Sequence, residues 1–214
     1  MINKINPDAE IGFDIPAVPG MAESEVQTPC LIVDLDRLEY NLKKMADLIA
    51  PFNVSLRAHA KMHKSVDVAL LQLTVGQANG ICCQKVSEAE VFFRAGITDI
   101  LITNQVCDAR KISRLAGLAA SGCRISVCVD DMRNVAMLSE EARKQSTQIH
   151  CLVELDCGAR RCGVSDAAQV LELAAAIDAA HCLVFEGLQA YQGSIQHETD
   201  YGLREKVMED VIAK

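Results

Sequence analysis

Apolar and polar residues follow a repeating pattern along most of this chain. Short apolar runs recur near residues 54–60, 79–83, 99–103, 124–129, 149–155 and 182–189. After each run comes a stretch in which apolar residues lie three and four positions apart, the spacing of an amphipathic helix. The chain is therefore predicted to repeat a strand and a helix six times.

Strands that alternate with helices of about three turns predict a parallel sheet with right-handed crossovers. Both an α/β barrel and a doubly wound sheet satisfy this pattern. The runs 100–102 and 125–129 are apolar on both faces, as expected where helices cover one side and a packed barrel interior fills the other. We therefore predict an α/β fold, a TIM-type (β/α) barrel. Because such a barrel has eight strands, the six units are expected to be an incomplete one, interrupted in the charged helix at 203–214.

The first 29 residues do not share this pattern. They hold four of the chain's five prolines and show no clear period, so we expect an irregular arm over residues 1–29. The barrel domain is expected over residues 30–214. It would open with a short apolar strand, 30–33, followed by a helix that Asp34 or Asp36 caps and Pro51 stops.

Composition narrows the class of ligand. Half of the residues are apolar, and 21 Lys and Arg stand against 29 Asp and Glu, a formal charge of −8. No run of basic residues appears, which argues against nucleic acid or an anionic membrane and favours a small molecule. The N-terminus lacks the apolar region of a secretory signal, and charged residues interrupt the most apolar stretch, 171–185, so we expect a cytoplasmic protein with no membrane span.

The chain has ten cysteines without a regular framework. Most of them lie in apolar, strand-like runs, so we interpret them as reduced core residues rather than disulfide partners. Structural zinc is the alternative. It is disfavoured because the sequence has no Cys-x-x-Cys pair, and the gaps between Cys123 and Cys128 and between Cys157 and Cys162 are longer than typical ligand loops.

The segment 54–65 carries the most informative chemistry. Its alternating apolar residues end at Lys61, which lies between His59 and His63 at the predicted carboxyl end of a strand. In parallel barrels that end forms the open face where chemistry gathers. A lysine there can bind an aldehyde cofactor as an imine. The alternative is a solvated lysine in a basic turn beside Lys64.

A glycine-rich motif, residues 154–164, follows the fifth predicted strand. Its two glycines allow close backbone approach, and Arg161 offers a rigid fork of donors for an anionic ligand. The alternative is a salt bridge from Arg161 to Glu154 or Asp156.

Two further strand ends carry polar residues. Tyr191, between glutamines after the sixth strand, suits a polar cavity, although a core aromatic is the alternative. Gln84 follows the second strand and is expected on the same rim as Lys61. A capping box of Ser87 and Glu90 is expected to begin the next helix.

The motifs occur in the order His-x-Lys-x-His-Lys-Ser, Cys-Gln-Lys-Val-Ser-Glu-Ala-Glu, Thr-Asn, Asp-x-Gly-x-x-Arg-x-Gly-Val and Gln-Ala-Tyr-Gln-Gly. This order resembles the pyridoxal-phosphate enzymes of the alanine racemase fold. Together with residues 12–17 and 27–30, it resembles the subgroup that contains 3-hydroxy-D-aspartate aldolase, D-threonine aldolase and D-serine dehydratase. The resemblance runs from about residue 11 to the end of the chain.

The resemblance implies that pyridoxal 5'-phosphate is held covalently by Lys61, with Arg161 near its phenolic oxygen. Tyr191 and Gln84 would lie close to its ring, and Asn104 is a further cofactor-binding candidate. His59 is the second catalytic candidate beside Lys61. In this family a later glycine-rich loop grips the phosphate, and a C-terminal β domain binds a divalent metal, manganese or magnesium. Neither feature occurs in this sequence, which is expected to hold no metal ligands itself.

The expected activity is a lyase reaction that cleaves a D-3-hydroxy amino acid, 3-hydroxy-D-aspartate or D-threonine, to glycine and an aldehyde. This chain alone is expected to be weak or inactive, and the full-length protein to be a homodimer. One alternative is a D-serine or 3-hydroxyaspartate dehydratase, or an amino-acid racemase, on the same fold. The other is a non-catalytic truncated product.

Overall fold

The computed structural model describes residues 8–214 and divides them into two compact units. The first unit contains residues 8–56 and 67–78, and the second contains residues 57–66 and 79–214. The prediction of an arm over 1–29 and a barrel over 30–214 stays a prediction, since residues 1–7 lie outside the described part. Residues 8–29 contain a 3₁₀ turn, η1 (Glu23–Glu25), and an isolated bridge between Ile11 and Ile15.

The first unit contains the long helix α1 (Leu35–Ile49), the turn η2 (Ala50–Phe52) and nearly all of α2 (Val66–Thr74). Asp34, rather than Asp36, caps α1 by accepting a hydrogen bond from the Arg37 amide. The expected strand at residues 30–33 is wrong, because this segment is irregular and Leu31 is 98% exposed. A strand needs a neighbour for its backbone N–H and C=O groups, and no described strand pairs with this segment.

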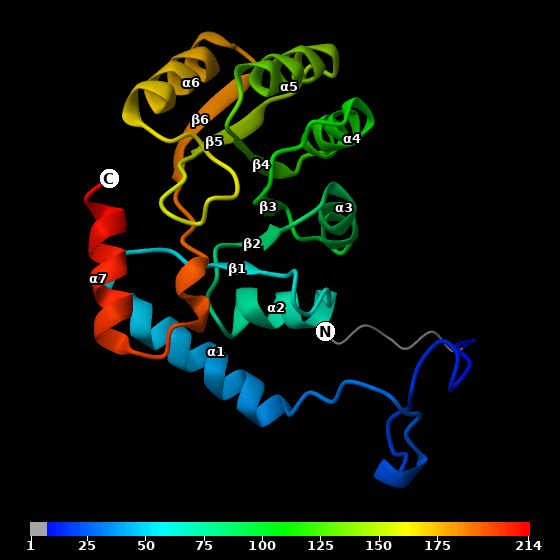
Figure 1. Ribbon diagram of the computed structural model, residues 1–214. Helices are drawn as coiled ribbons and strands as arrows, with labels where there is room; N and C mark the ends of the chain where they lie inside the picture. The colour runs from blue at the N-terminus through cyan, green and yellow to red at the C-terminus, as the bar shows by residue number, and fades with distance from the viewer. Residues whose placement is uncertain (1–7) are drawn as a thin grey trace. The chain divides into compact units, whose positions relative to one another are not determined.

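The second unit is built on a parallel sheet whose strands follow one another in chain order (Figure 1). The strands are β1 (Arg57–His59), β2 (Gly80–Cys83), β3 (Asp99–Ile102), β4 (Arg124–Val129), β5 (Ile149–Glu154) and β6 (Leu183–Gln189). This confirms the predicted repeat, although β1 is shorter than the run at 54–60 that predicted it. Among the described residues β1 and β6 do not pair, so the sheet is not closed.

Helices follow the strands and cover one side of the sheet (Figure 1). The covering helices are α3 (Val86–Arg94), α4 (Ala109–Ala120), α5 (Met132–Lys144) and α6 (Ala167–Ala179). After β6 the chain continues into η3 (Ser194–His197) and α7 (Tyr201–Ile212). Aspartate side chains cap four of these helices by accepting a backbone N–H; they are Asp108, Asp131, Asp166 and Asp200. No helix within residues 8–214 is both long and apolar enough to cross a membrane.

The capping box expected at the start of α3 is wrong. The cap residue is Lys85, which makes no side-chain capping bond, and Ser87 lies one residue inside the helix. Glu90 instead accepts a hydrogen bond of 2.7 Å from Nε of Arg114 on α4. A charge-assisted bond of this kind is stronger than a neutral one, and it takes the carboxylate away from the helix start.

Alternate strand residues point to the side of the sheet opposite the helices and form three layers. Residues two positions apart on a strand face the same side of the sheet. The layers do not follow the pairing register throughout, since Leu101 of the middle layer pairs with Ser126 rather than with Cys128. The middle layer is apolar and consists of Cys82, Leu101, Cys128 and Leu152. Burial raises the pKa of the Cys82 thiol to about 11, so this side chain stays neutral inside the layer. All ten cysteines are free thiols.

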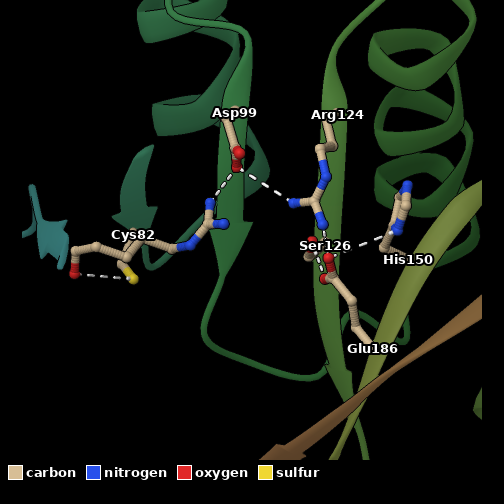
Figure 2. A network of polar contacts seen from close by, with 7 residues as sticks. Cys82, Asp99, Arg124, Ser126, His150 and Glu186 are labelled. Atoms are coloured by element: carbon tan, nitrogen blue, oxygen red, sulfur yellow. Dashed lines mark hydrogen bonds and ion pairs between the residues drawn. The ribbon is translucent and has the colours of Figure 1, made fainter. Parts of the chain in front are cut away.

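The layer nearest the strand starts is ionic (Figure 2). Asp99 lies between the guanidinium groups of Arg57 and Arg124, and Arg124 also contacts Glu186. The Ser126 hydroxyl donates to Glu186 over 2.6 Å, and His150 Nδ1 lies 3.6 Å from the same carboxylate. Glu186 is the extra residue of a bulge, because Phe185 pairs with Cys151 and Gly187 pairs with Leu152. Charged side chains link β1, β3, β4 and β6 in this layer, and His150 of β5 lies beside them with a pKa lowered by burial and by Arg124. The members of the layer are Arg57, Asp99, Arg124, Ser126, His150 and Glu186.

The ionic layer predicts a strict requirement for glycine at residue 80. A Cβ atom there would lie 2.6 Å from Nη1 of Arg57 and 2.8 Å from the backbone oxygen of Asp99. We expect Gly80→Ala to lower the free energy of unfolding by about 1–3 kcal/mol, as overpacking of a core does. Urea unfolding followed by circular dichroism measures the change.

The matched control is Gly117→Ala in α4, where the new Cβ would meet its nearest neighbour, Gln145, at an ordinary 3.6 Å. Alanine favours a helix over glycine by about 1 kcal/mol, so this variant should be as stable as the parent or more so. Equal urea midpoints for the Gly80→Ala variant and the parent would contradict the packing described for the ionic layer.

Candidate functional site

A polar pocket lies at the carboxyl ends of the strands, above the middle layer. Its walls surround about 370 Å³ of empty space, part of it open to solvent. The lining side chains come from β1 and β6 and from the loops after β1, β2, β3, β5 and β6; they are His59, Lys61, Gln84, Thr103, Asn104, Arg161, Gln189 and Tyr191. The structure therefore brings together all six residues that the sequence singled out as site residues.

Tyr191 lies between the two cationic groups of the pocket. The distance from its ring centroid to Lys61 Nζ is 5.8 Å, and that to the Arg161 guanidinium carbon is 5.2 Å. Both distances are within the range of cation–π attraction. Gly193 leaves room for this ring, because a Cβ there would lie 2.6 Å from Tyr191 Cε1. The tyrosine thus belongs to the polar pocket rather than to the core.

Lys61 and Lys64 have different surroundings, although both are near the pocket. Lys64 Nζ donates to Glu88 over 2.8 Å, and the same carboxylate accepts the Gln84 backbone N–H over 2.9 Å. Burial raises the pKa of Glu88, but the hydrogen bonds from Lys64 and Gln84 outweigh this and leave it below its usual value. Lys61 has no carboxylate partner among the described residues, so its amine is the one available to a ligand.

His59 is held at both ring nitrogens. The backbone N–H of Lys61 donates to Nδ1 over 3.2 Å, and Nε2 lies 3.0 Å from the Thr103 hydroxyl. Burial and the nearby charge of Lys61 lower the pKa of His59, so its neutral form is favoured at neutral pH.

The Arg161 loop is shaped by carboxylates that bind its backbone. Asp156 accepts the amides of Gly158 and Arg160 over 2.9 and 3.0 Å, and Asp130 accepts the amide of Gly163 over 2.9 Å. Gly163 has a φ of +103°, and a Cβ there would lie 2.6 Å from the Asp156 nitrogen. Glycine is therefore required at this point, as the motif suggested.

Glu154 lies beneath Arg161 and is 4% exposed. Its carboxylate accepts a hydrogen bond from Gln105 over 2.6 Å and lies 3.8 Å from Nη2 of Arg161. Burial raises the pKa of Glu154 despite these two partners. Arg161 therefore takes part in the ion pair offered as an alternative, yet half of its side chain stays exposed toward the pocket. Asp156 is not its partner, because that carboxylate binds backbone amides.

Sequence reasoning did not assign Thr103 or Gln189 to the site, and it named Glu154 only as a possible salt-bridge partner of Arg161. Thr103 and Glu154 each lie two positions after a residue of the middle layer, Leu101 or Leu152, and Gln189 pairs with Glu154. The alternation of side chains along the strands was therefore the signal that could have found them. Asn104 was predicted, and its amide nitrogen donates to the backbone oxygen of Gln84 over 2.9 Å. Asn104 thus joins two strand ends as well as lining the pocket.

Within residues 8–214 no group of three or more His, Cys, Asp or Glu side chains is placed to hold a metal ion. The side chains that line the pocket offer an amine, a guanidinium, an imidazole, a phenol, a hydroxyl and amides.

Comparison with known families gives one match over most of the chain. The sequence model of the alanine racemase N-terminal domain matches residues 33–209. A 3-hydroxy-D-aspartate aldolase from Paracoccus denitrificans (strain Pd 1222) is 52% identical over 205 residues, which is 96% of this chain and 53% of that protein. A D-threonine aldolase from an Arthrobacter species is 47% identical over 187 residues, 87% of this chain and 49% of that protein.

Solved structures agree with the sequence matches. The crystal structure of D-threonine aldolase from Filomicrobium marinum has a TM-score of 0.88 and 45% identity, covering 92% of this chain and 52% of that one. The D-threo-3-hydroxyaspartate dehydratase from Delftia sp. HT23 has a TM-score of 0.81 and 28% identity, covering 88% and 49%. The chain spans about half the length of the relatives it matches, and its fold is that of the barrel portion of these proteins.

The surroundings of His59 predict an acid-shifted titration. We expect its pKa, measured by NMR on the isotope-labelled chain, to lie below the ordinary 6.5. The unfolded chain then binds the proton more readily, so His59 makes the fold less stable as pH falls from 7 through that midpoint. Lys61→Met removes the neighbouring charge and should raise the midpoint only partly, because burial is the larger cause. A midpoint at or above 6.5 in the unaltered chain would contradict this description.

Proposed function

Because this chain belongs to the alanine racemase N-terminal domain family, we propose that it is the cofactor-binding barrel portion of a pyridoxal-phosphate-dependent aldehyde-lyase. The proposed substrates are D-3-hydroxy amino acids, 3-hydroxy-D-aspartate or D-threonine, which would be cleaved to glycine and an aldehyde. The observation that best supports this proposal is the pocket in which the amine of Lys61 and the guanidinium of Arg161 both lie near the ring of Tyr191.

The residues present fit an aromatic aldehyde with an ionised phenol. Lys61 supplies an amine without a carboxylate partner among the described residues, and Arg161 supplies a permanent charge with planar donors. Tyr191 provides a flat face beside them, and Gln84 and Asn104 add amides at the rim. The apolar middle layer lies between the pocket and the ionic layer.

Each pocket residue has a role that follows from its position. Lys61 would hold the cofactor through its amine, and Arg161 would keep the phenol oxygen in its ionised form by charge and hydrogen bonding. Glu154 holds the inner side of Arg161, so the exposed side of the guanidinium faces the ligand. When bound, pyridoxal phosphate supplies an electron sink for cleavage of the bond between Cα and Cβ.

The balance of the comparisons favours an aldolase over a dehydratase. The two aldolases named above are 52% and 47% identical to this chain, whereas the dehydratase from a Delftia species is 34% identical over 65% of it. A dehydratase or racemase on the same scaffold is therefore the second candidate. We further propose that the complete protein is a homodimer that uses a divalent metal, manganese or magnesium, bound outside residues 8–214.

The proposal predicts where the cofactor becomes attached. After incubation of the chain with pyridoxal 5'-phosphate and reduction with borohydride, peptide mapping should find the label on Lys61. Lys64 is the internal comparison, since its amine is paired with Glu88 over 2.8 Å. The Lys61→Ala chain should take up no label at this segment. Label on Lys64 or Lys85 with none on Lys61 would contradict the assignment.

The proposal also predicts that Arg161 tunes the cofactor rather than stabilising the fold. Arg161→Lys keeps the charge but loses the planar fork, so the visible absorption band of the cofactor-loaded chain should shift. The melting temperature should change little, because exposed substitutions usually alter stability by less than about 0.5 kcal/mol.

Arg160→Lys is the matched control for this experiment. Arg160 is the neighbouring arginine, is exposed and does not line the pocket, so its replacement should leave the band in place. A large drop in melting temperature for Arg161→Lys with an unchanged spectrum would instead make Arg161 a structural ion-pair residue.

A further inference from the structure

We propose that His59 and Thr103 form a positioning pair for Lys61, in which the imidazole is fixed as the neutral Nε2–H tautomer between the Lys61 amide and the Thr103 hydroxyl. The pair would hold the lysine that carries the cofactor, so its purpose rests on the proposed function. In this proposal Thr103 fixes the orientation of the His59 ring, and His59 is a positioning residue for Lys61 rather than a catalytic residue.

The tautomer follows from the hydrogen bonds. A backbone N–H can only donate, so the 3.2 Å contact from the Lys61 nitrogen requires a lone pair on His59 Nδ1. In a neutral imidazole the proton then resides on Nε2, which lies 3.0 Å from Thr103 Oγ1 and donates to it. The threonine hydroxyl in turn donates to the Cys83 carbonyl over 3.3 Å. Every donor in this chain of bonds meets one acceptor.

A protonated His59 would break this arrangement. Its Nδ1–H would point at the Lys61 amide N–H, placing two donors face to face. Burial and the nearby charge of Lys61 disfavour the positive ring, as does His63, and together they outweigh the opposing effects of Glu88 and of the Cys82 carbonyl. The lowered pKa of His59 agrees with the neutral form that the geometry requires.

The pair joins Lys61 to the rigid part of the sheet. Lys61 lies in a turn, two residues beyond the end of β1. Through His59 its backbone is bound to Thr103, which follows β3, and β2 lies between these two strands. Thr103 is itself fixed, because its own amide donates to the Cys83 carbonyl over 2.9 Å. A turn that carries a reactive amine is thus held by a strand two places away.

The pair also leaves His59 without a free nitrogen. A general base needs an available lone pair within reach of the proton it takes, and the lone pair of Nδ1 is used by the Lys61 amide. Loss of the His59 ring should therefore change the position of the Lys61 amine rather than remove a proton acceptor.

The first test needs no cofactor. In the labelled chain, two-bond ¹H–¹⁵N correlation spectra should show His59 protonated on Nε2 at neutral pH. Thr103→Val removes the hydroxyl at nearly constant volume and should raise the hydrogen-exchange rate of the Lys61 amide about two- to tenfold, the effect of one lost hydrogen bond. Thr103→Ser should restore the parent rate.

Thr74→Val is the control for the threonine replacement. Its hydroxyl donates to the Leu70 carbonyl within α2, and Thr74 does not line the pocket, so the Lys61 amide should exchange as in the parent. Unchanged protection of amides in β4 and β5 in the Thr103→Val variant shows that the sheet remains folded.

The second test measures the affinity for the cofactor, which depends on the position of the Lys61 amine. The dissociation constant for pyridoxal 5'-phosphate should rise about two- to tenfold in Thr103→Val and return to the parent value in Thr103→Ser. His59→Asn keeps an acceptor close to the Lys61 amide but loses the bond to Thr103, so it should behave like Thr103→Val rather than abolish binding.

The outcomes separate the two proposals. An Nδ1-protonated or charged His59 at neutral pH, or a Lys61 amide that exchanges equally in the parent and in Thr103→Val, overturns the positioning pair. An unaltered chain that captures no pyridoxal phosphate contradicts the proposed function, while the tautomer and exchange results still decide whether the pair holds the Lys61 turn.

Discussion

The structure depends on one constraint, the alternation of side chains along six parallel strands that pair in chain order. Because residues two positions apart face the same side on every strand, each strand contributes a series of side chains to the same interior. Charges meet at the strand starts, apolar side chains meet in the middle, and polar side chains meet at the strand ends. A slip of one residue on a single strand would replace its inward side chains with those that face the helices.

Function follows from this layering, because the apolar middle layer separates two polar regions with different roles. Below it, Asp99 and Glu186 are matched by Arg57 and Arg124, so this region balances its own charge. Above it, the amine of Lys61 has no carboxylate partner among the described residues and faces a pocket.

The sequence predicted most of the sheet and the main residues of the pocket. Strand alternation and helix spacing were sufficient for the parallel repeat, and a lysine at a strand end was sufficient for the site. It could not show that residues 30–33 lack a strand partner, since pairing is a tertiary property. It did not assign Thr103 to the site, because Thr103 contacts His59 across 44 residues of sequence. It named Glu154 as one of two possible partners of Arg161, and only the structure distinguishes it from Asp156.

The most direct test of this account is amide chemical-shift mapping of the labelled chain titrated with pyridoxal 5'-phosphate. The account predicts that the largest shifts occur at the strand ends, at Lys61, Gln84 and Tyr191, while amides of the ionic layer near Arg124 and His150 stay in place. Shifts confined to the ionic layer, or to any surface away from the Lys61 pocket, would contradict it.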